Sequence, residues 1–412
     1  MKLLNILLLG FLAMVLAWAA WILSKPKVYR QSTPQQEEVL NGLLPPDVQH
    51  GNSVTTYTSM EEMFEHMTSD MNSANHHVHM LFFKFEDDAT GRRLGTTMAA
   101  LAANRVQVRL LYDDFMCRQW KPLYRRLRKQ GVDARGYNPV HLPILIKRDY
   151  YRTHRKLALI DGRVAYIGGV NIADRYLYGL PWGRWRDTMV RIEGPAVAAL
   201  QRSFVADWHF ATGQLLASPA YFPRVAAAGT LPVRIITSGP IGDGPAIMHY
   251  TVGLLDRAER YAWFESPYFI PTPELRQAFL AAARRGVDVR VLLPPRGDRG
   301  EGTQLASKSY FAEAMAAGIK IGLYQSGYLH SKIIVCDDTT AVVGSCNLDP
   351  RSQLLCQEVA AVIDDNGYAA ELKQVFLADE AESSYIDPAE WATRSCWQKT
   401  QESIMRLVAS QL

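Results

Sequence analysis

Apolar and polar positions along the chain form the pattern expected of strands and helices that follow one another. Residues 54–59 have the pattern of a strand, and a helical pattern follows as far as residue 74. A long apolar strand then spans 78–85, before a helix at about 91–103 and a strand over 106–112. Strands that alternate with helices predict an α/β sheet covered by helices on both faces.

The second half of the chain repeats this order. The matched segments are 54–59 with 233–238, 79–85 with 263–269, 106–111 with 287–292, and the helical stretches 200–207 with 372–379. A duplicated domain in one chain predicts two pseudo-twofold-related halves that each contribute to one central cleft. We therefore expect that neither half is active alone.

An uncharged segment precedes these halves. Residues 3–24 form a run of 22 residues, bounded by Lys2 and by Lys25 and Lys27, and are long enough to span a bilayer. A cleaved signal peptide is the alternative, with a cleavage site at 17–19, but the apolar residues continue beyond that site and favour a retained anchor. Positive charges after the segment outnumber those before it, which favours a catalytic domain on the cytoplasmic side.

The chain is therefore expected to have five parts. They are an anchor at 1–24, a polar linker at 25–50, a first half at 51–215, a second half at 216–385 and an amphipathic helical tail at 386–412. The tail either packs on the body of the protein or lies on the membrane. The expected fold is an N-terminal transmembrane helix followed by a duplicated α/β sandwich.

Composition limits the classes of function. The 412 residues are 48% hydrophobic and 21% charged, so the chain can bury a large core. The net charge of +4 is too small to indicate a nucleic-acid partner, and it suits anionic lipid head groups as well as an ordinary balanced surface. The five cysteines include no C-x-x-C pair, which favours buried free thiols over zinc or redox chemistry.

One motif occurs once in each half. Both copies follow H-x-K-x4-D, with an asparagine seventeen residues after the histidine. The two copies are His154, Lys156, Asp161 and Asn171, and His330, Lys332, Asp337 and Asn347. The apolar run after each lysine predicts a buried strand, on which a histidine and a lysine two residues apart point to the same face.

The aspartates Asp161 and Asp337 complete the motif, and we include them in the catalytic set. Each has the opposite parity to the histidine and lysine and stands at the end of its strand, in a sequence typical of a hairpin turn. This position favours a structural role for both. Small residues follow each turn, at 168–169 and 344–345, and allow the backbone to approach a ligand closely.

Two histidines, two lysines and two asparagines that converge on one point form a site for a tetrahedral phosphate. One histidine attacks phosphorus as an uncharged imidazole, while the other donates a proton to the leaving oxygen and later takes one from the incoming alcohol. The lysines hold the phosphate oxygens as charge develops, together with the amides of Asn171 and Asn347. This chemistry requires no metal and no other cofactor.

Two acids stand at matched positions in the halves. Asp187 and Glu358 each lie at the start of the strand that follows a motif. A carboxylate on a neighbouring strand can fix the tautomer of a catalytic histidine and support its charged form. We expect these acids to orient the two histidines, with an ordinary salt bridge at a strand end as the alternative.

The duplicated motif resembles the hallmark of the phospholipase D superfamily, and further stretches narrow the resemblance to bacterial cardiolipin synthases. These stretches are 151–156, 168–174, 185–188, 191–197, 266–271, 285–294 and 347–352. The resemblance runs from about residue 51 to the C-terminus. Two departures are that Cys356 stands where that family usually has asparagine, and that one hydrophobic N-terminal segment stands where longer members have two, which leaves the membrane topology open.

The resemblance implies a phospholipase D-type fold and a phosphatidyltransferase of the bacterial inner membrane, whose partners are phospholipids. One phosphatidylglycerol is attacked at phosphorus, glycerol leaves, and a second phosphatidylglycerol attacks the phosphatidyl-histidine intermediate to give cardiolipin. We assign His154 as nucleophile and His330 as acid and then base, although pseudo-symmetry allows the reverse. Asp187 and Glu358 are similar to the acids that bond the catalytic histidines in the superfamily.

Other activities share these residues. Water as the acceptor would make the protein a phospholipase D hydrolase, and another head group would make it a different phosphatidyltransferase. Whether the acceptor lipid is phosphatidylglycerol or phosphatidylethanolamine stays open. A nuclease is a more distant alternative that the weak net charge disfavours. A non-catalytic lipid-binding protein would be expected to lack a motif histidine or lysine, and the need for a partner protein stays open.

Two further features have competing explanations. His76, His77 and His79 look like a metal cluster, but no acid or cysteine is spaced to join them, so we expect a surface or packing role. The apolar loop 139–146 and the aromatic insertion 176–185 either line the mouth of the cleft, in contact with the bilayer, or pack in the core.

Overall fold

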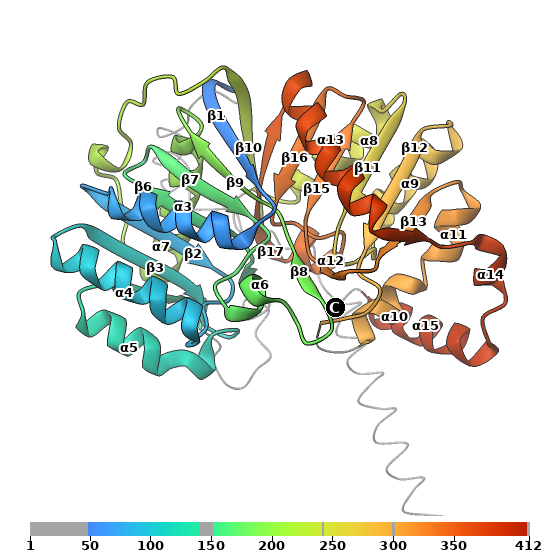
Figure 1. Cartoon of the computed structure of the whole chain (residues 1–412), viewed down its shortest axis with the longest axis horizontal. Coiled ribbons are helices and arrows are strands. Elements are labelled where there is room, and N and C mark those ends of the chain that lie inside the picture. The colour runs from blue at the N-terminus through green and yellow to red at the C-terminus, as the bar shows by residue number, and fades with distance from the viewer. Residues whose placement is uncertain (1–47, 140–150, 241–242, 299–300, 410–412) are drawn as a thin grey trace, which may run out of the picture.

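The structure is a computed structural model that describes residues 48–139, 151–240, 243–298 and 301–409 (Figure 1). The expected anchor, nearly all of the expected linker and the loop after residue 139 lie outside these residues. None of the described helices is long and apolar enough to cross a membrane.

The first half alternates strands with helices in the predicted order. Its strands are β1 (Gln49–Tyr57), β2 (His77–Phe82), β3 (Gln107–Asp113), β4 (Asp133–Tyr137), β5 (Arg152–Thr153), β6 (Lys156–Ile160), β7 (Val164–Gly168), β8 (Arg184–Arg186) and β9 (Met189–Glu193). Its helices are α3 (Met60–Asn72), α4 (Ala89–Ala103), α5 (Lys121–Lys129), α6 (Asp174–Tyr178) and α7 (Val197–Thr212), with short 3-10 turns at η1 (Arg118–Trp120) and η3 (Pro219–Tyr221).

The second half repeats the arrangement and adds a helical tail. Its strands are β10 (Leu231–Ser238), β11 (Tyr261–Glu265), β12 (Asp288–Leu293), β13 (Lys320–Tyr324), β14 (Gly327–Leu329), β15 (Ile333–Cys336), β16 (Thr340–Gly344), β17 (Cys356–Ile363) and β18 (Ser383–Tyr385). Its helices are α8 (Ala246–Arg257), α9 (Pro273–Arg284), α10 (Gly302–Lys308), α11 (Phe311–Ala316), α12 (Pro350–Leu354), α13 (Asn366–Ala381), α14 (Pro388–Ala392) and α15 (Cys396–Val408).

The strand order of the large sheet reveals the duplication. β1 and β10 pair antiparallel at the centre of the sheet (Figure 1). Outward from β1 the order is β9-β7-β6-β2-β3-β4, and outward from β10 it is β17-β16-β15-β11-β12-β13, so equivalent strands occupy equivalent places. The predicted mixed α/β fold built from a duplicated domain is therefore confirmed.

The hydrophobic cores explain why the two halves stay together. One core belongs to the first half and packs α3 and α4 on its strands, and another belongs to the second half and packs α8 and α9. A further core is shared, because it buries Leu200 and Phe204 of α7 together with Leu372 and Phe376 of α13. Burial of apolar surface from both halves in one core stabilises the joined molecule.

The histidines at the start of β2 lie in the interior. His77 and His79 are fully buried, with ring centroids 4.5 Å apart, and the amide of Gln201 lies within hydrogen-bond distance of both rings. Burial lowers the pKa of His77 to about 4 and that of His79 well below its usual value. These two residues pack in the core, and no cluster of metal-ligating side chains occurs in the described part of the chain.

The tail forms two helices, α14 and α15. The inner face of α15 packs against α10, where Met405 contacts a small cluster that includes Ala306. The outer face carries apolar side chains that are largely exposed, at 67% for Trp397, 55% for Ile404 and 84% for Leu407. The tail thus packs on the body through one face and presents an apolar stripe on the other.

Candidate active site

Short strands bring each motif histidine against the other half of the molecule. β5, just before His154, pairs in parallel with the start of β17 in the second half. β14, just before His330, pairs in parallel with β8 in the first half. The two pairings continue as main-chain hydrogen bonds from the His154 N–H to Gln357 and from the His330 N–H to Arg186.

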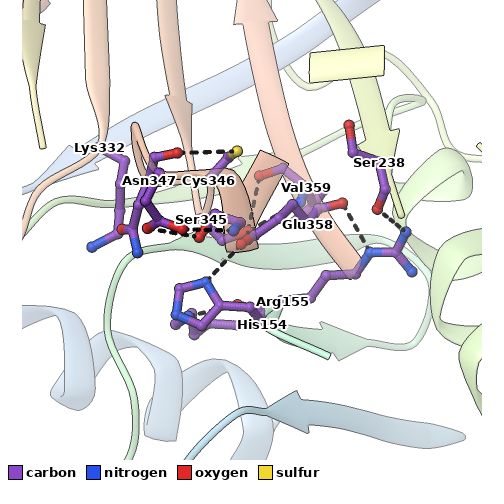
Figure 2. A network of polar contacts seen from close by, with 12 residues as sticks. His154, Arg155, Ser238, Lys332, Ser345, Cys346, Asn347, Glu358 and Val359 are labelled. Carbon is purple, nitrogen blue, oxygen red and sulfur yellow. Dashed lines mark hydrogen bonds and ion pairs between the residues drawn. The ribbon is translucent and has the colours of Figure 1, made fainter. Parts of the chain in front are cut away.

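This pairing sets an acid of one half beside the histidine of the other. His154 Nδ1 lies 2.8 Å from Glu358 Oε1 (Figure 2), and His330 Nδ1 lies 2.6 Å from Asp187 Oδ2. Both acids are fully buried, so the geometry is held in a region of low dielectric. Each neutral histidine that donates its Nδ1 proton to the carboxylate keeps a lone pair on Nε2 for chemistry.

The electrostatics of the site favour uncharged imidazoles. Burial, followed by the charges of Lys156 and Lys332, lowers the pKa of His154 well below its usual value. Burial and Lys332 lower the pKa of His330 to about 3, against the opposing effect of Asp187. An uncharged histidine is the form that attacks phosphorus.

The pKa values of the two acids are shifted in opposite directions. Burial raises the pKa of Glu358 to about 7, and its second oxygen accepts a hydrogen bond of 2.5 Å from Ser345 Oγ. Burial also acts to raise the pKa of Asp187, but His330 and Lys332 together bring it below its usual value. Asp187 is therefore ionised at neutral pH and better able to support a positive charge on His330.

The motif lysines point back along the strand toward their histidines. Lys156 Nζ donates to the main-chain oxygen of His154 over 2.5 Å, and Lys332 Nζ donates to that of His330. Both lysines are almost completely buried, and burial lowers the pKa of Lys332 to about 8. Two desolvated ammonium groups at one site attract an anionic ligand.

The motif asparagines have different surroundings. Asn171 Oδ1 accepts the main-chain N–H of Lys84 over 3.0 Å, and its Nδ2 donates to the hydroxyl of Tyr176 over 2.8 Å. Asn347 Oδ1 is buried without a hydrogen-bond partner in the part of the chain that the structure describes. Both asparagines line the cavity between the histidines.

The motif aspartates lie away from the histidines. Asp161 and Asp337 each have a positive φ in the hairpin turn, and each carboxylate accepts main-chain N–H bonds from three successive residues of the preceding loop. These residues are 75–77 in the first half and 259–261 in the second. Arg155 and the five residues of β6 separate His154 from Asp161, and the strand alone is roughly 16 Å long. The placement supports the structural role over a catalytic one.

One cavity of about 230 Å³ contains both motif histidines. Phe83 and Lys84 line the side of His154, and the Phe83 ring centroid lies 4.8 Å from that of His154. On the other side, the rings of Trp185 and Tyr176 lie 5.0 and 6.4 Å from His330. The aromatic insertion therefore reaches the cavity.

Lys84 is one of several lining residues that the motif analysis did not identify, and it carries a charge. It contributes to the lowered pKa of His154, and it stands at the matched position of Tyr268 in the second half. The sequence did contain a signal for Lys84. It follows a strand that is matched in the second half, and unlike residues at matched positions, here lysine and tyrosine, indicate where the two halves of a site differ.

A duplicated α/β fold in which one histidine from each half lines a common cavity, with a lysine two residues after each histidine, defines the phospholipase D-like class of proteins. The chain matches the family described as "Cardiolipin synthase, PLD-like domain" over residues 67–208 and 252–379. The chain belongs to this family.

Individual proteins agree with the family match. The chain is 37% identical over 363 residues to the cardiolipin synthase of Listeria welshimeri, a match that covers 87% of this chain and 75% of that protein. It is 36% identical over 362 residues to the cardiolipin synthase of Staphylococcus aureus strain Mu50, covering 87% and 73%. Its fold is similar to the crystal structure of the phosphatidylserine synthase of Haemophilus influenzae, with a TM-score of 0.70, 13% identity, and coverage of 92% and 100%.

Proposed function

We propose that this protein is a cardiolipin synthase that transfers a phosphatidyl group from one phosphatidylglycerol to another through a phosphatidyl-histidine intermediate. The observation that carries the proposal is the pair of buried histidines at one cavity, each bonded at Nδ1 to a carboxylate of the other half. This arrangement supplies a nucleophile and an acid-base group on opposite sides of one phosphorus.

In the first step, His154 Nε2 attacks phosphorus, and the bond from phosphorus to the glycerol oxygen breaks. The negative charge of the bound phosphodiester favours the charged form of His330, with the support of Asp187, and His330 gives its proton to the leaving oxygen. The products of this step are free glycerol and a phosphatidyl group on His154.

In the second step, the primary hydroxyl of another phosphatidylglycerol loses its proton to His330 and attacks phosphorus. The bond to His154 Nε2 breaks, and cardiolipin leaves. In this proposal Lys156 and Lys332, whose ammonium groups lie beside the motif histidines, turn to hold the equatorial oxygens in both steps. Asn171 and Asn347, which line the cavity, add amide donors. No step requires a metal or a cofactor.

We further propose that the cavity opens at a membrane surface. A volume of about 230 Å³ suits a head group but not two acyl chains, so the chains stay outside. The helix that carries the apolar stripe, α15, packs through its other face on α10, whose Thr303 lines the cavity. An exposed apolar stripe is suited to the bilayer interface. A membrane anchor at 3–24, with the catalytic halves on the cytoplasmic side of a bacterial inner membrane, completes this proposal.

The membrane proposal has a direct test. The reference is the protein that begins at residue 48 without further changes. The same protein with Trp397→Ser and Leu407→Ser should bind phosphatidylglycerol vesicles at least about ten-fold more weakly than this reference, because it loses apolar surface at the interface. Sedimentation with vesicles measures the binding. Tyr385→Ser, at an exposed residue of β18, is the matched control. Equal binding by all three proteins would contradict the proposal.

The catalytic proposal is tested with purified protein in mixed micelles of phosphatidylglycerol, with the lipid products followed by mass spectrometry. Cardiolipin and free glycerol should form in equal amounts with the wild-type protein, and neither should form with His154→Ala or His330→Ala. Phosphatidic acid in place of cardiolipin would make the protein a hydrolase. Absence of any lipid turnover would contradict the proposal.

A further inference from the structure

Two buried ion pairs lie next to the residues whose carboxylates bond to the motif histidines, and neither pair takes part in the proposed transfer reaction. Arg155 Nη1 lies 2.6 Å from Asp207 Oδ2, and Arg186 Nη2 lies 2.6 Å from Asp379 Oδ2. All four side chains are almost completely buried. Because charged groups lose hydration when they are buried, such pairs are weak evidence for stability and raise the question of another role.

The two pairs are built from different sequence positions. Asp207 on α7 and Asp379 on α13 occupy matched places in the two halves. The arginines do not, because Arg155 follows a motif histidine whereas Arg186 precedes the acid that bonds to the other one. The positions that correspond to these arginines hold a serine and a glutamine. The guanidinium thus comes from the residue next to the histidine in one site and from the residue next to the acid in the other.

Despite this difference, both arginines make the same contact. Arg155 Nε donates to the main-chain oxygen of Glu358 over 3.0 Å (Figure 2), and Arg186 Nη1 donates to the main-chain oxygen of Asp187. Each guanidinium therefore ties a helix acid to the residue whose carboxylate bonds to a motif histidine. Arginine suits this task because its rigid planar fork holds several acceptors in one geometry.

The site around Asp187 has additional links of this kind. Arg186 Nη1 also donates to Thr188 Oγ1 over 3.0 Å, and this hydroxyl lies 2.9 Å from Ser331 Oγ, in the residue next to His330. Glu265 lies in the same cluster, where burial and then Asp379 raise its pKa well above its usual value. A neutral Glu265 leaves Asp379 as the counter-ion of Arg186.

We infer that the pairs Arg155–Asp207 and Arg186–Asp379 are positioning groups, which hold the carboxylates of Glu358 and Asp187 in register with the two catalytic histidines. The inference rests on the proposed function. A carboxylate displaced by a fraction of an ångström supports the imidazolium less well, so loss of a pair acts on turnover through the histidine.

The test compares two neighbouring residues of α13. Asp379→Asn removes the charge that holds Arg186, whereas Glu380→Gln removes a carboxylate that pairs with Arg290 in a partly exposed site. Full-length proteins are assayed with phosphatidylglycerol in mixed micelles, and kcat, KM, thermal stability and the pH profile of kcat are measured. Asp379→Asn should lower kcat about 10- to 100-fold and leave KM within about two-fold. Glu380→Gln should change neither.

The pH profile separates positioning from simple loss of stability. His330 is faced by Asp187, which favours its charged form, and by Lys332 and Lys156, which oppose it. Weaker support from Asp187 lowers the pKa of His330, so the limb of the profile where activity falls with rising pH should move to lower pH in Asp379→Asn. A profile identical to that of Glu380→Gln would overturn the inference.

Two further variants test the inference if Asp379→Asn fails to fold. Arg186→Lys keeps the positive charge but cannot reach Asp379, Thr188 and the main chain of Asp187 together, so it should show the same shifted pH limb. Asp207→Asn tests the other pair and should slow formation of the covalent intermediate. If the wild-type protein makes cardiolipin while all these variants match the control, only the positioning inference fails. If the wild-type protein makes none, the proposed function fails first.

Discussion

The two motif histidines share the lysine and the aspartate of the motif but have different surroundings in space. His154 faces Phe83 and the charge of Lys84, whereas His330 is surrounded by aromatic rings, among them Trp185 and Tyr328. Positive charge beside a neutral imidazole attracts the phosphate to that side. This difference supports His154 as the nucleophile and His330 as the acid-base group.

This assignment predicts where a covalent intermediate forms. A phosphatidyl ester of 4-nitrophenol needs no general acid, because its leaving group is a weak base. His330→Ala should therefore release about one equivalent of nitrophenol and retain a phosphatidyl group on the peptide that contains His154, as measured by mass spectrometry. His154→Ala should release none. A label on the peptide with His330 would reverse the assignment.

A second residue-scale prediction concerns pH. A lysine whose pKa is lowered to about 8 is charged below that pH and neutral above it, so Lys332 holds phosphate less well in alkaline solution. We expect kcat/KM for phosphatidylglycerol to fall as pH rises through about 8. In Lys332→Arg the guanidinium stays charged, so any residual activity should lack this limb. If the variant shows the same fall in kcat/KM with rising pH, that fall arises from the titration of another group.

At the scale of elements, the short strands and the tight turns have different roles. β5 and β14 are only long enough to fix the register of each histidine against the acid of the other half. The hairpins that end β6 and β15 place Asp161 and Asp337 where their carboxylates accept N–H groups of the preceding loop. The motif thus combines residues for chemistry with a residue that closes a turn.

The turn predicts a stability effect without a matching loss of activity. Burial raises the pKa of Asp161, but the N–H groups of residues 75–77 together bring it below its usual value, so ionised Asp161 stabilises the fold. Asp161→Asn should lower the free energy of unfolding by about 1–3 kcal/mol at neutral pH. Because a lowered carboxyl pKa contributes stability above the unfolded pKa, the difference should shrink as pH falls below about 4.

Thermal unfolding across pH measures this effect, with Asp133→Asn, in an exposed ion pair with Arg135, as the control. Turnover by folded Asp161→Asn protein should stay within about three-fold of the wild-type rate, because the carboxylate does not contact the cavity. A severe loss of turnover in a normally stable variant would return Asp161 to the catalytic set.

At the scale of the whole molecule, the two halves depend on one another in two ways, for stability and for the geometry of the site. They share a hydrophobic core that includes α7 and α13, and each supplies the acid for the histidine of the other. The expected boundary at 215/216 falls between the end of α7 and the start of β10. That division of the chain stays a prediction.

The dependence predicts the behaviour of the separated halves. Residues 48–215 and 216–412, produced alone, should show no cooperative unfolding and no transfer activity, because each leaves part of the shared core exposed. Produced together, they should recover measurable cardiolipin formation. Calorimetry and the lipid assay test both statements. Activity in either half alone would refute the shared site.

Much of the fold was predictable because its signals are local. Segments such as 106–111 and 287–292 carry their strand pattern in their own residues, so the order of elements and the duplication followed directly. The sequence pattern predicted a helical tail without dividing it, and the structure divides it into the separate helices α14 and α15. Helix ends depend on caps and packing that a pattern of apolar residues describes poorly.

The sequence by itself determined which chemical groups the protein has and which face of a strand they share. His154 and Lys156 stand two positions apart at the start of a strand pattern, the spacing that predicts a shared face, and Asp161 closes a turn because its neighbours allow one. These are properties of a few adjacent residues. They need no knowledge of the rest of the chain.

Only the tertiary structure decided which groups meet. His154 and Glu358 are 204 residues apart, and His330 and Asp187 are 143 apart, so no local pattern specifies that the acids are exchanged between halves. The lowered pKa values of both histidines and the buried arginine pairs follow from the same packing. Burial removes water and brings distant charges together, and both effects depend on the complete fold.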